Sequence, residues 1–570
     1  MSLASSLLLV AAFQAQAASV TVDPNSFELE VGSTMQLNVQ VQDDAGSPIR
    51  NASVRWFSRD PGVASVTQSG TVTAVNPGMV QILVVSGGAR GIVTVTVPEL
   101  PPTSIELALA NGSVRTGASA PLEVAVTTRT GTLLADPDVT FRTGNDNVAA
   151  IDRNGRIYGR SPGTVRITAT AGTVSEFIAV RIVENPARDY RIVPDGAKMR
   201  TGDVIRFQVA AMSPRGERVT GISPEWTMSG PGAQIDTEDG EGVFVAEEAG
   251  RYRVTALIGE ATMRSTFVDI TERVSTASMS TVGRGPITEN HSGDVWVFEG
   301  VDGRDYAYIG TLFYDWMKVW DVTDPTSPVL MDSMQLDARR INDVKIHPNS
   351  RVGVLTREGA SNRRNGIVIL DLSTPAHPTI ASEYTATVTG GVHNVWIEPN
   401  DLVYAAHNGT SNMHIIDISD PTNPREVGVW GIEKSASQKS LHDIIIQEGY
   451  AYLSYWDDGL VVLDVGAGTH GGTPTRPVQV SQFKYPIGNT HTAWRHGRYL
   501  FLGDEIFPPN WDPDRPIDPR GYVHVIDMND IENPKEVGRY EIPEAGAHNL
   551  WVDGDRLFIG YYQAGLRVVD

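Results

Sequence analysis

The chain has 570 residues, which is too long for a single ordinary domain, so several domains are expected. Its formal net charge of −22 repels nucleic acid and anionic lipid, and the absence of cysteine excludes disulfides, thiolate metal sites and cysteine nucleophiles. The 55 glycines and 34 prolines, set among short runs of valine, threonine and isoleucine, predict an all-β protein of short strands and tight turns.

Residues 1–18 have the pattern of a signal peptide. An apolar run from Leu7 to Phe13 is followed by Ala15-Gln16-Ala17, a small-x-small site of the kind that signal peptidase cleaves. The run is too short to span a bilayer, and no later segment is long and apolar enough to do so. We therefore expect an extracytoplasmic protein (secreted, periplasmic or on the cell surface) that is not inserted in the membrane.

The first half repeats with a period of 85 residues. Trp56, Phe141 and Trp226 follow one another at this spacing, and Gly70 and Gly155 keep the same step. A unit of this length, with alternating strands and frequent turns, suits a small β-sandwich whose central strand buries one large aromatic side chain. The sequence predicts three tandem β-sandwiches, at residues 19–98, 102–184 and 186–272.

The first two units, exemplified by "WFSRDPGVASV" followed by "SGTV" and "PGMVQI", resemble the bacterial Ig-like family, group 2. The third unit, 186–272, keeps Trp226 and the final "AGRYRVTA" but departs from the pattern in its middle. The resemblance implies spacer or adhesive modules of a cell-surface protein, without catalysis.

A second repeat occupies residues 274–570. An apolar triplet followed by aspartate recurs at Asp321, Asp371, Asp417, Asp464, Asp527 and Asp570. A second element, such as "HNVWIE" or "HDIIIQ", lies upstream of each triplet, at steps of 49 to 57 residues. With one strand between the two elements and one after the aspartate, each unit has the four antiparallel strands of a propeller blade. We predict a six-bladed β-propeller, and its apolar-apolar-Asp endings resemble the LVIVD-repeat family. We interpret the aspartates as caps of the turns that follow them.

The sixth blade ends after its third strand. Either residues 277–285 supply the missing fourth strand and close the ring, or the sequence stops short of it at Asp570.

A set of imidazole and carboxylate side chains is predicted at one end of the propeller channel. The first strands of four blades begin at equivalent histidines: His393, His442, His491 and His548. Asp504 and Glu505 end the second strand of the fifth blade. With His291, these residues make up the predicted metal set. Such side chains are ligands of zinc, copper, iron or manganese, so the set indicates a site for a divalent transition metal. The alternative is that each histidine, or the Asp or Asn that follows it, bonds to the next blade and fastens the ring.

The loops between the second and third strands differ from blade to blade, and variable loops on a regular scaffold are common binding surfaces. Their aromatic and basic residues are candidate contacts for a glycan or protein ligand: Tyr314, Trp316, Arg363, Arg364, Trp456, Trp511 and Tyr562. The alternative is that the aromatic rings only pack the loops onto the blades.

The favoured interpretation is an exported or cell-surface binding protein, expected to be a monomer, in which an Ig-like stalk presents a propeller that binds a glycan or protein ligand. The alternatives are a metal-dependent enzyme at the mouth of the channel and a purely structural or adhesive element. Serine and cysteine hydrolase motifs, Walker loops and dinucleotide fingerprints are missing from the sequence, so catalytic residues stay unassigned.

Overall fold

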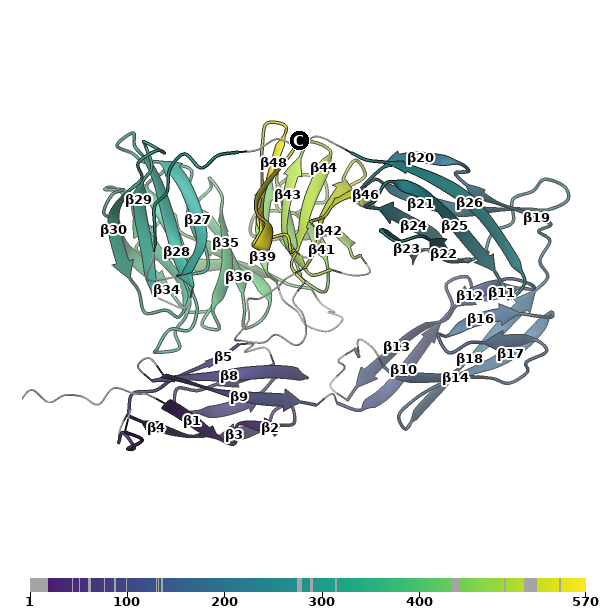
Figure 1. The fold of residues 1–570 in the computed structure, drawn as a ribbon, viewed down its shortest axis with the longest axis horizontal. Coiled ribbons are helices and arrows are strands. Elements are labelled where there is room, and N and C mark those ends of the chain that lie inside the picture. The colour runs from purple at the N-terminus through teal and green to yellow at the C-terminus, as the bar shows by residue number, and fades with distance from the viewer. Residues whose placement is uncertain are drawn as a thin grey trace, which may run out of the picture. The chain divides into compact units, whose positions relative to one another are not determined.

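The computed structural model describes residues 19–570, except 44, 51, 60–62, 76, 87–88, 99, 130, 132, 135–136, 274–278, 288–290, 313–314, 433–440, 486–487, 507–519 and 543–544. The described residues form strands and a single 3-10 turn, η1 (Tyr562–Ala564), which confirms the predicted all-β class (Figure 1). The predicted signal peptide lies outside the described residues. None of the helical structure in the described part is long and apolar enough to cross a membrane.

The chain divides into two compact units, one of residues 1–104 with 126–131 and 172–174, the other of the remaining residues. The first module contains a four-stranded sheet in the order β2-β9-β8-β5 and a three-stranded sheet in the order β3-β7-β6. Its strands are β1 (Ser19–Asp23), β2 (Ser26–Glu28), β3 (Thr34–Gln36), β4 (Asn38–Gln42), β5 (Arg55–Ser58), β6 (Ala64–Val66), β7 (Thr71–Ala74), β8 (Gly78–Ser86) and β9 (Ala89–Val97).

The second and third modules repeat the four-stranded sheet, in the orders β11-β18-β17-β14 and β20-β26-β25-β22, each with a parallel edge strand like that of β2 against β9. Their strands are β10 (Pro102–Ala108), β11 (Ser113–Arg115), β12 (Ser119–Pro121), β13 (Glu123–Thr128), β14 (Val139–Thr143), β15 (Ala149–Ile151), β16 (Arg156–Gly159), β17 (Gly163–Ala171), β18 (Val174–Val183), β19 (Asp189–Val193), β20 (Ala197–Arg200), β21 (Val204–Met212), β22 (Glu225–Ser229), β23 (Ala233–Glu238), β24 (Glu241–Ala246), β25 (Gly250–Ile258) and β26 (Thr262–Thr271).

The aromatic residues that mark the 85-residue period lie in the module cores. Trp56 is buried in β5, and a Cβ on Gly70 would come within 3.1 Å of its ring. Gly155 approaches Phe141 in the second module in the same way, at 3.0 Å. Both glycines also have positive φ angles, of 83° and 78°. The aromatic residue and the glycine therefore repeat together because of packing: a larger residue at the glycine position would clash with the aromatic ring.

The second half forms six consecutive sheets, which we call the sheet ring. Five have four antiparallel strands that follow one another in chain order, and the last has three. Their strands are β27 (His291–Glu299), β28 (Asp305–Leu312), β29 (Trp316–Asp321), β30 (Val329–Gln335); β31 (Val344–Ile346), β32 (Val352–Arg357), β33 (Gly366–Asp371), β34 (Thr379–Tyr384); β35 (Val392–Ile397), β36 (Leu402–His407), β37 (Asn412–Asp417), β38 (Arg425–Trp430); β39 (Asp443–Gln447), β40 (Tyr450–Ser454), β41 (Leu460–Asp464), β42 (Val478–Phe483); β43 (Thr490–His496), β44 (Tyr499–Asp504), β45 (Val523–Asp527), β46 (Lys535–Tyr540); and β47 (Leu550–Asp553), β48 (Arg556–Tyr561), β49 (Gly565–Val569).

The first strands of the six sheets contact one another in sequence, from β27 through β31, β35, β39 and β43 to β47. The last sheet also contacts the first: Asn549 Nδ2 donates to Asp294 Oδ1 at 3.4 Å, and the rings of Trp551 and Trp296 lie edge to face with centroids 5.9 Å apart. The sheets therefore close on themselves, in the arrangement expected for a propeller.

The recurring aspartates cap turns. Asp417 Oδ1 accepts a hydrogen bond from the backbone N–H of Ser419 at 2.9 Å, and Asp420 accepts one from that of Thr422 at 3.0 Å. These bonds stabilise the ionised carboxylate, so the pKa of Asp417 is lowered. The prediction of a structural role for these aspartates is confirmed by this geometry.

Residues 279–287 do not supply the fourth strand of the sixth sheet. They form no strand, and Gly283 and Gly285 lie against Pro325 and Trp320 of the first sheet. The alternative that closed the ring with residues 277–285 is wrong for the described part of that segment, 279–285, because the last sheet contains β47, β48 and β49 without it; residues 277–278 lie outside the described residues.

Candidate metal centre

Four histidines come together at the inner rim of the sheet ring. His393 lies in β35 and His491 in β43, while His442 immediately precedes β39 and His548 lies two residues before β47. Their rings follow one another with centroid distances of 4.3 Å from His393 to His442, 4.2 Å from His442 to His491 and 4.0 Å from His491 to His548. Equivalent positions of neighbouring sheets therefore form one histidine cluster.

Glu505, which directly follows β44, faces this cluster. Its Oε2 lies 3.8 Å from Nε2 of His442 and of His491, and its Oε1 lies 3.7 Å from Nε2 of His548. Ligand atoms of His442, His491 and Glu505 all lie within 4.8 Å of one another. Metal–ligand distances of about 2.0–2.2 Å are usual for zinc, so one ion placed between these atoms would contact all three after small side-chain adjustments.

The state of these side chains fits a divalent transition metal. Burial lowers the pKa of His442 and of His491 well below the ordinary value, so both imidazoles are neutral, which is the form that binds metal. Their Nδ1 atoms have no hydrogen-bond partner among the described residues. Burial also raises the pKa of Glu505 to about 8, and a bound cation would stabilise its ionised form.

Two of the residues predicted to bind a glycan or protein ligand, Trp456 and Tyr562, border the histidine cluster. The ring of Trp456 stacks on that of His442, at 5.2 Å and 26°. The hydroxyl of Tyr562 donates to Glu505 Oε1, and its ring lies edge-on to His548 at 5.0 Å. Since Tyr562 is 39% exposed, this side of the cluster is open to solvent.

Glu358 contacts His393, the first histidine of the cluster. Nδ1 of His393 lies 2.8 Å from Glu358 Oε1. Burial raises the pKa of Glu358, but the positive charge of Arg340 and the hydrogen bond with His393 outweigh burial and bring the pKa well below the ordinary value. Glu358 is therefore ionised, and it fixes the orientation of the His393 ring.

The bonds that fasten neighbouring sheets come mainly from the residues beside the histidine positions. Asp343 Oδ2 accepts from the backbone N–H of Val395 at 2.8 Å, and Asn394 Oδ1 accepts from that of Ile444 at 3.1 Å. The contact of Asn549 with Asp294 links the last and first sheets. Since the Asp and Asn side chains make these bonds, the imidazoles are left to face one another and Glu505.

Four members of the predicted metal set lie outside the group of close ligand atoms: His393 and His548, which belong to the histidine cluster, and Asp504 and His291, which lie apart from it. Asp504 is fully buried, with Oδ2 2.8 Å from Nε2 of His524, and its other oxygen accepts from the hydroxyl of Tyr485. His291 is an exposed residue at the start of β27, two positions before Gly293, which takes the histidine position in the first sheet.

The other predicted ligand contacts are dispersed. Trp316 is half-buried at the start of β29, with Nζ of Lys318 5.1 Å from its ring. Arg363 and Arg364 are exposed between β32 and β33, where Arg364 Nη2 donates to Thr385 Oγ1 at 3.0 Å. Tyr314 and Trp511 lie outside the described residues.

A buried ionic network beside Glu505 had not been predicted. His524 lies between Asp504 and Glu536, with Nδ1 2.5 Å from Glu536 Oε1, and Arg539 Nε donates to the same glutamate at 2.6 Å. The third sheet has the matching pair His414 and Glu426, also 2.5 Å apart. The shared patterns "HIID…REVG" and "HVID…KEVG" are the sequence signal that could have revealed both pairs.

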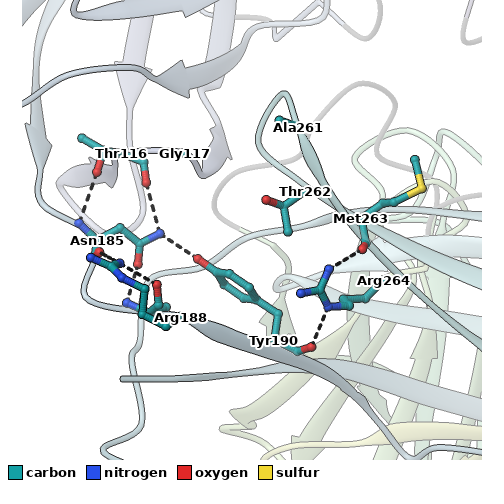
Figure 2. A pocket seen from close by; sticks show the side chains of 10 residues that line it. Thr116, Gly117, Asn185, Arg188, Tyr190, Ala261, Thr262, Met263 and Arg264 are labelled. Carbon is teal, nitrogen blue, oxygen red and sulfur yellow. Dashed lines mark hydrogen bonds between the residues drawn. The ribbon is translucent and has the colours of Figure 1, made fainter. Parts of the chain in front are cut away.

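A cavity of about 720 Å³ lies elsewhere in the larger unit, between the second and third modules (Figure 2). The hydroxyl of Tyr190 accepts a hydrogen bond from Asn185 Nδ2 at 2.8 Å, and the backbone oxygen of Tyr190 accepts one from Arg264 Nε at 3.0 Å. Since these lining groups bond to one another, we interpret the cavity as part of the interface between the second and third modules.

Family comparisons agree with the module order of the structure. The model of the bacterial Ig-like domain (group 2) matches residues 16–97 and 102–180, and that of the LVIVD repeat matches residues 291–335, 361–386, 389–430 and 440–482. The chain therefore contains group 2 bacterial Ig-like domains followed by LVIVD repeats, which confirms both predicted resemblances.

Individual similarities are more distant. A stretch of 178 residues, 31% of this chain, is 28% identical to ice-binding protein 1 of Shewanella frigidimarina (strain NCIMB 400) and covers 20% of that protein. Among solved structures, the adhesin FdeC of Escherichia coli is 14% identical, with 45% of this chain and 98% of that chain covered and a TM-score of 0.24. The β-propeller domain of Cps50 from Myceliophteria thermophila is 11% identical, with 67% and 99% covered and a TM-score of 0.36. The chain thus spans about a fifth of the length of the curated relative that it matches.

Proposed function

We propose that this is an extracellular surface protein whose sheet ring binds a divalent transition metal ion through His442, His491 and Glu505. The observation that carries the proposal is the convergence of these three ligand atoms within 4.8 Å, from the residue before β39, from β43 and from the residue after β44. The group 2 bacterial Ig-like domains, the similarity to ice-binding protein 1 and the predicted signal peptide support an extracellular location.

Two imidazoles and one carboxylate are a common ligand set of catalytic zinc, and such sites keep at least one position open. An open position lets the metal activate a water molecule or take an oxygen atom of an external ligand. Here His548, whose side chain is 37% exposed, and Tyr562 lie on the solvent side, where that position would be. The metal-dependent alternative is therefore the function that the geometry supports best.

Metal content tests this proposal. After incubation with zinc and gel filtration, we expect about one equivalent of metal per chain in the wild type, measured by elemental mass spectrometry. Glu505→Gln, which keeps the size of the side chain, and His442→Ala with His491→Ala should bring the content to background, because each removes ligand atoms. The matched control is His470→Ala, since His470 pairs with Glu532 at 3.1 Å away from the cluster. A folded wild type that takes up no zinc, copper, iron or manganese would refute the proposal.

A second candidate function is the binding of a glycan or protein ligand by the variable loops. It is favoured by the exposure of Arg363 and Arg364 in one such loop, together with the half-buried ring of Trp316. Aromatic rings stack on sugars, and exposed guanidinium groups bind acidic groups.

Glycan-array binding with variants tests the second candidate. If the loops bind a glycan, Trp316→Ala and Arg363→Ala should each weaken the signal at least about tenfold, in line with the loss of a central contact residue. The metal content should stay unchanged in both variants. Equal binding by the wild type and both variants would exclude these loops as the contact surface.

A further inference from the structure

Two arginines flank the histidine cluster on its second-sheet side. Arg339 and Arg340 lie in the connection between β30 and β31, and the backbone of Arg340 pairs with that of Glu358. Arg339 Nη2 lies 3.5 Å from Glu358 Oε2, and Arg340 Nε lies 4.0 Å from the same oxygen. The carboxylate that orients His393 thus also holds both guanidinium groups next to the cluster.

The two arginines differ in what surrounds them. Arg339 is held by its backbone bond to Glu358 and by contact with Gly359, and its side chain is 18% exposed. Arg340 is more exposed, at 24%, and its Nε lies 4.0 Å from Glu358 Oε2, while the other oxygen of Glu358 lies 2.8 Å from Nδ1 of His393. One carboxylate therefore separates its guanidinium from His393, whose ring centroid lies 4.3 Å from that of the candidate metal ligand His442.

The charges next to the histidine cluster also favour the binding of an anion. The carboxylates next to the cluster are Glu358, beside His393, and Glu505, beside the other three histidines. Two guanidinium groups and a divalent ion outweigh these two carboxylates. The resulting positive field attracts a negatively charged ligand to the open side, where Tyr562 and His548 are exposed.

We infer that the rim binds an oxyanion, a carboxylate or phosphate group, with one oxygen on the metal and another on the guanidinium of Arg340. The planar fork of arginine matches both groups, and such charge-assisted hydrogen bonds are among the stronger ones in proteins. The ring of Trp456, stacked on His442, would cover an apolar part of the same ligand. This inference rests on the proposed metal site and names the class of ligand that the site takes.

The test uses the full chain loaded with Co²⁺, whose visible spectrum reports on its ligands. Inorganic phosphate and acetate are titrated separately in a chloride-free buffer, so that the two arms distinguish a phosphate from a carboxylate ligand. We expect a saturable spectral change with at least one of them. Arg340→Gln should weaken that anion at least about tenfold while the anion-free spectrum stays the same, in line with the loss of one charge-assisted hydrogen bond.

Arg425→Gln is the matched control, because Arg425 pairs with Asp417 at 2.7 Å in a turn away from the cluster, and it should bind the anion as the wild type does. A Co²⁺ spectrum that neither anion changes, or an equal affinity in Arg340→Gln and wild type, would overturn the anion site and leave the metal site standing. A chain that shows no Co²⁺ spectrum at all would overturn both.

Discussion

Replacing His524 by alanine is expected to destabilise the sheet ring by about 3–5 kcal/mol, because it leaves buried carboxylates without their partner. The imidazole is 1% exposed and lies within hydrogen-bonding distance of Asp504 on one side and Glu536 on the other. Burial lowers the pKa of His524, but the two carboxylates outweigh burial and raise the pKa to about 9, so the ring is charged at neutral pH.

The pH dependence of this effect has a definite sign. Because the pKa of His524 is higher in the folded chain than its ordinary value near 6.5, its stabilising contribution is complete below about pH 6.5 and is lost as the pH rises through about 9. The difference in calorimetric melting temperature between wild type and His524→Ala should therefore be largest near pH 6 and become smaller as the pH rises through about 9. His470→Ala, at a partly exposed site, should melt like the wild type. Equal melting temperatures of His524→Ala and wild type at pH 6 would contradict the assignment.

Replacing Lys345 by methionine should have a similarly large effect. Nζ of Lys345 lies 2.9 Å from Asp294 Oδ2 and also contacts Asp343, and all three groups are mostly buried. Burial lowers the pKa of Lys345, but Asp294 and Asp343 outweigh burial and raise it, so the ammonium is charged. Burial raises the pKa of Asp343 well above its ordinary value, whereas Lys345 helps to keep that of Asp294 low, so Asp294 carries the negative charge. Removal of the ammonium leaves this buried carboxylate unpaired, and we expect a loss of about 3–5 kcal/mol.

A double variant and a change of pH check this explanation. Without the ammonium, the pKa of Asp294 rises in the folded chain, so Lys345→Met should be less destabilised at pH 5 than at pH 8 in denaturant titrations. Adding Asp294→Asn removes the unpaired charge and should restore part of the stability. If the double variant is as unstable as Lys345→Met at pH 8, the unpaired charge of Asp294 is not the cause.

The repeats made the fold and the histidine cluster predictable from the sequence. Each sheet packs against its neighbours in the same way, so apolar and polar residues recur at the same positions, and the histidines of four sheets mark equivalent places. His393, His442, His491 and His548 could therefore be expected to lie together before any coordinates were known, although their role as metal ligands stays a proposal.

Side-chain direction at strand ends was harder to predict. Asp504 and Glu505 are adjacent, and the sequence placed both among the metal candidates. Successive residues of a strand point to opposite sides. Asp504 therefore turns toward His524, and Glu505 turns toward the histidines.

The other residues around the histidine cluster lie in or next to connections that do not repeat, so their places could not be predicted from the sequence. Arg340 and Glu358 come from a connection and a strand end of the second sheet, where no period indicates which way a side chain points. Trp456 and Tyr562 were assigned to a separate ligand surface for the same reason, and the structure places both beside the histidine cluster.

The division of roles between neighbouring residues at the inner rim has an evolutionary consequence. Asp343 and Asn394 bond to the next sheet, whereas the preceding His393 has its ring in the histidine cluster; Asn342 also bonds to the next sheet, through Nδ2 to the backbone oxygen of His393 at 2.9 Å. A mutation at a histidine position can therefore change the chemistry of the rim while assembly is maintained by the residue next to it. The first and second sheets, with Gly293 and Asn342 at this position, already differ from the other four. Such a ring can gain, lose or exchange a bound metal one substitution at a time, which makes it a suitable scaffold for the evolution or design of new binding sites.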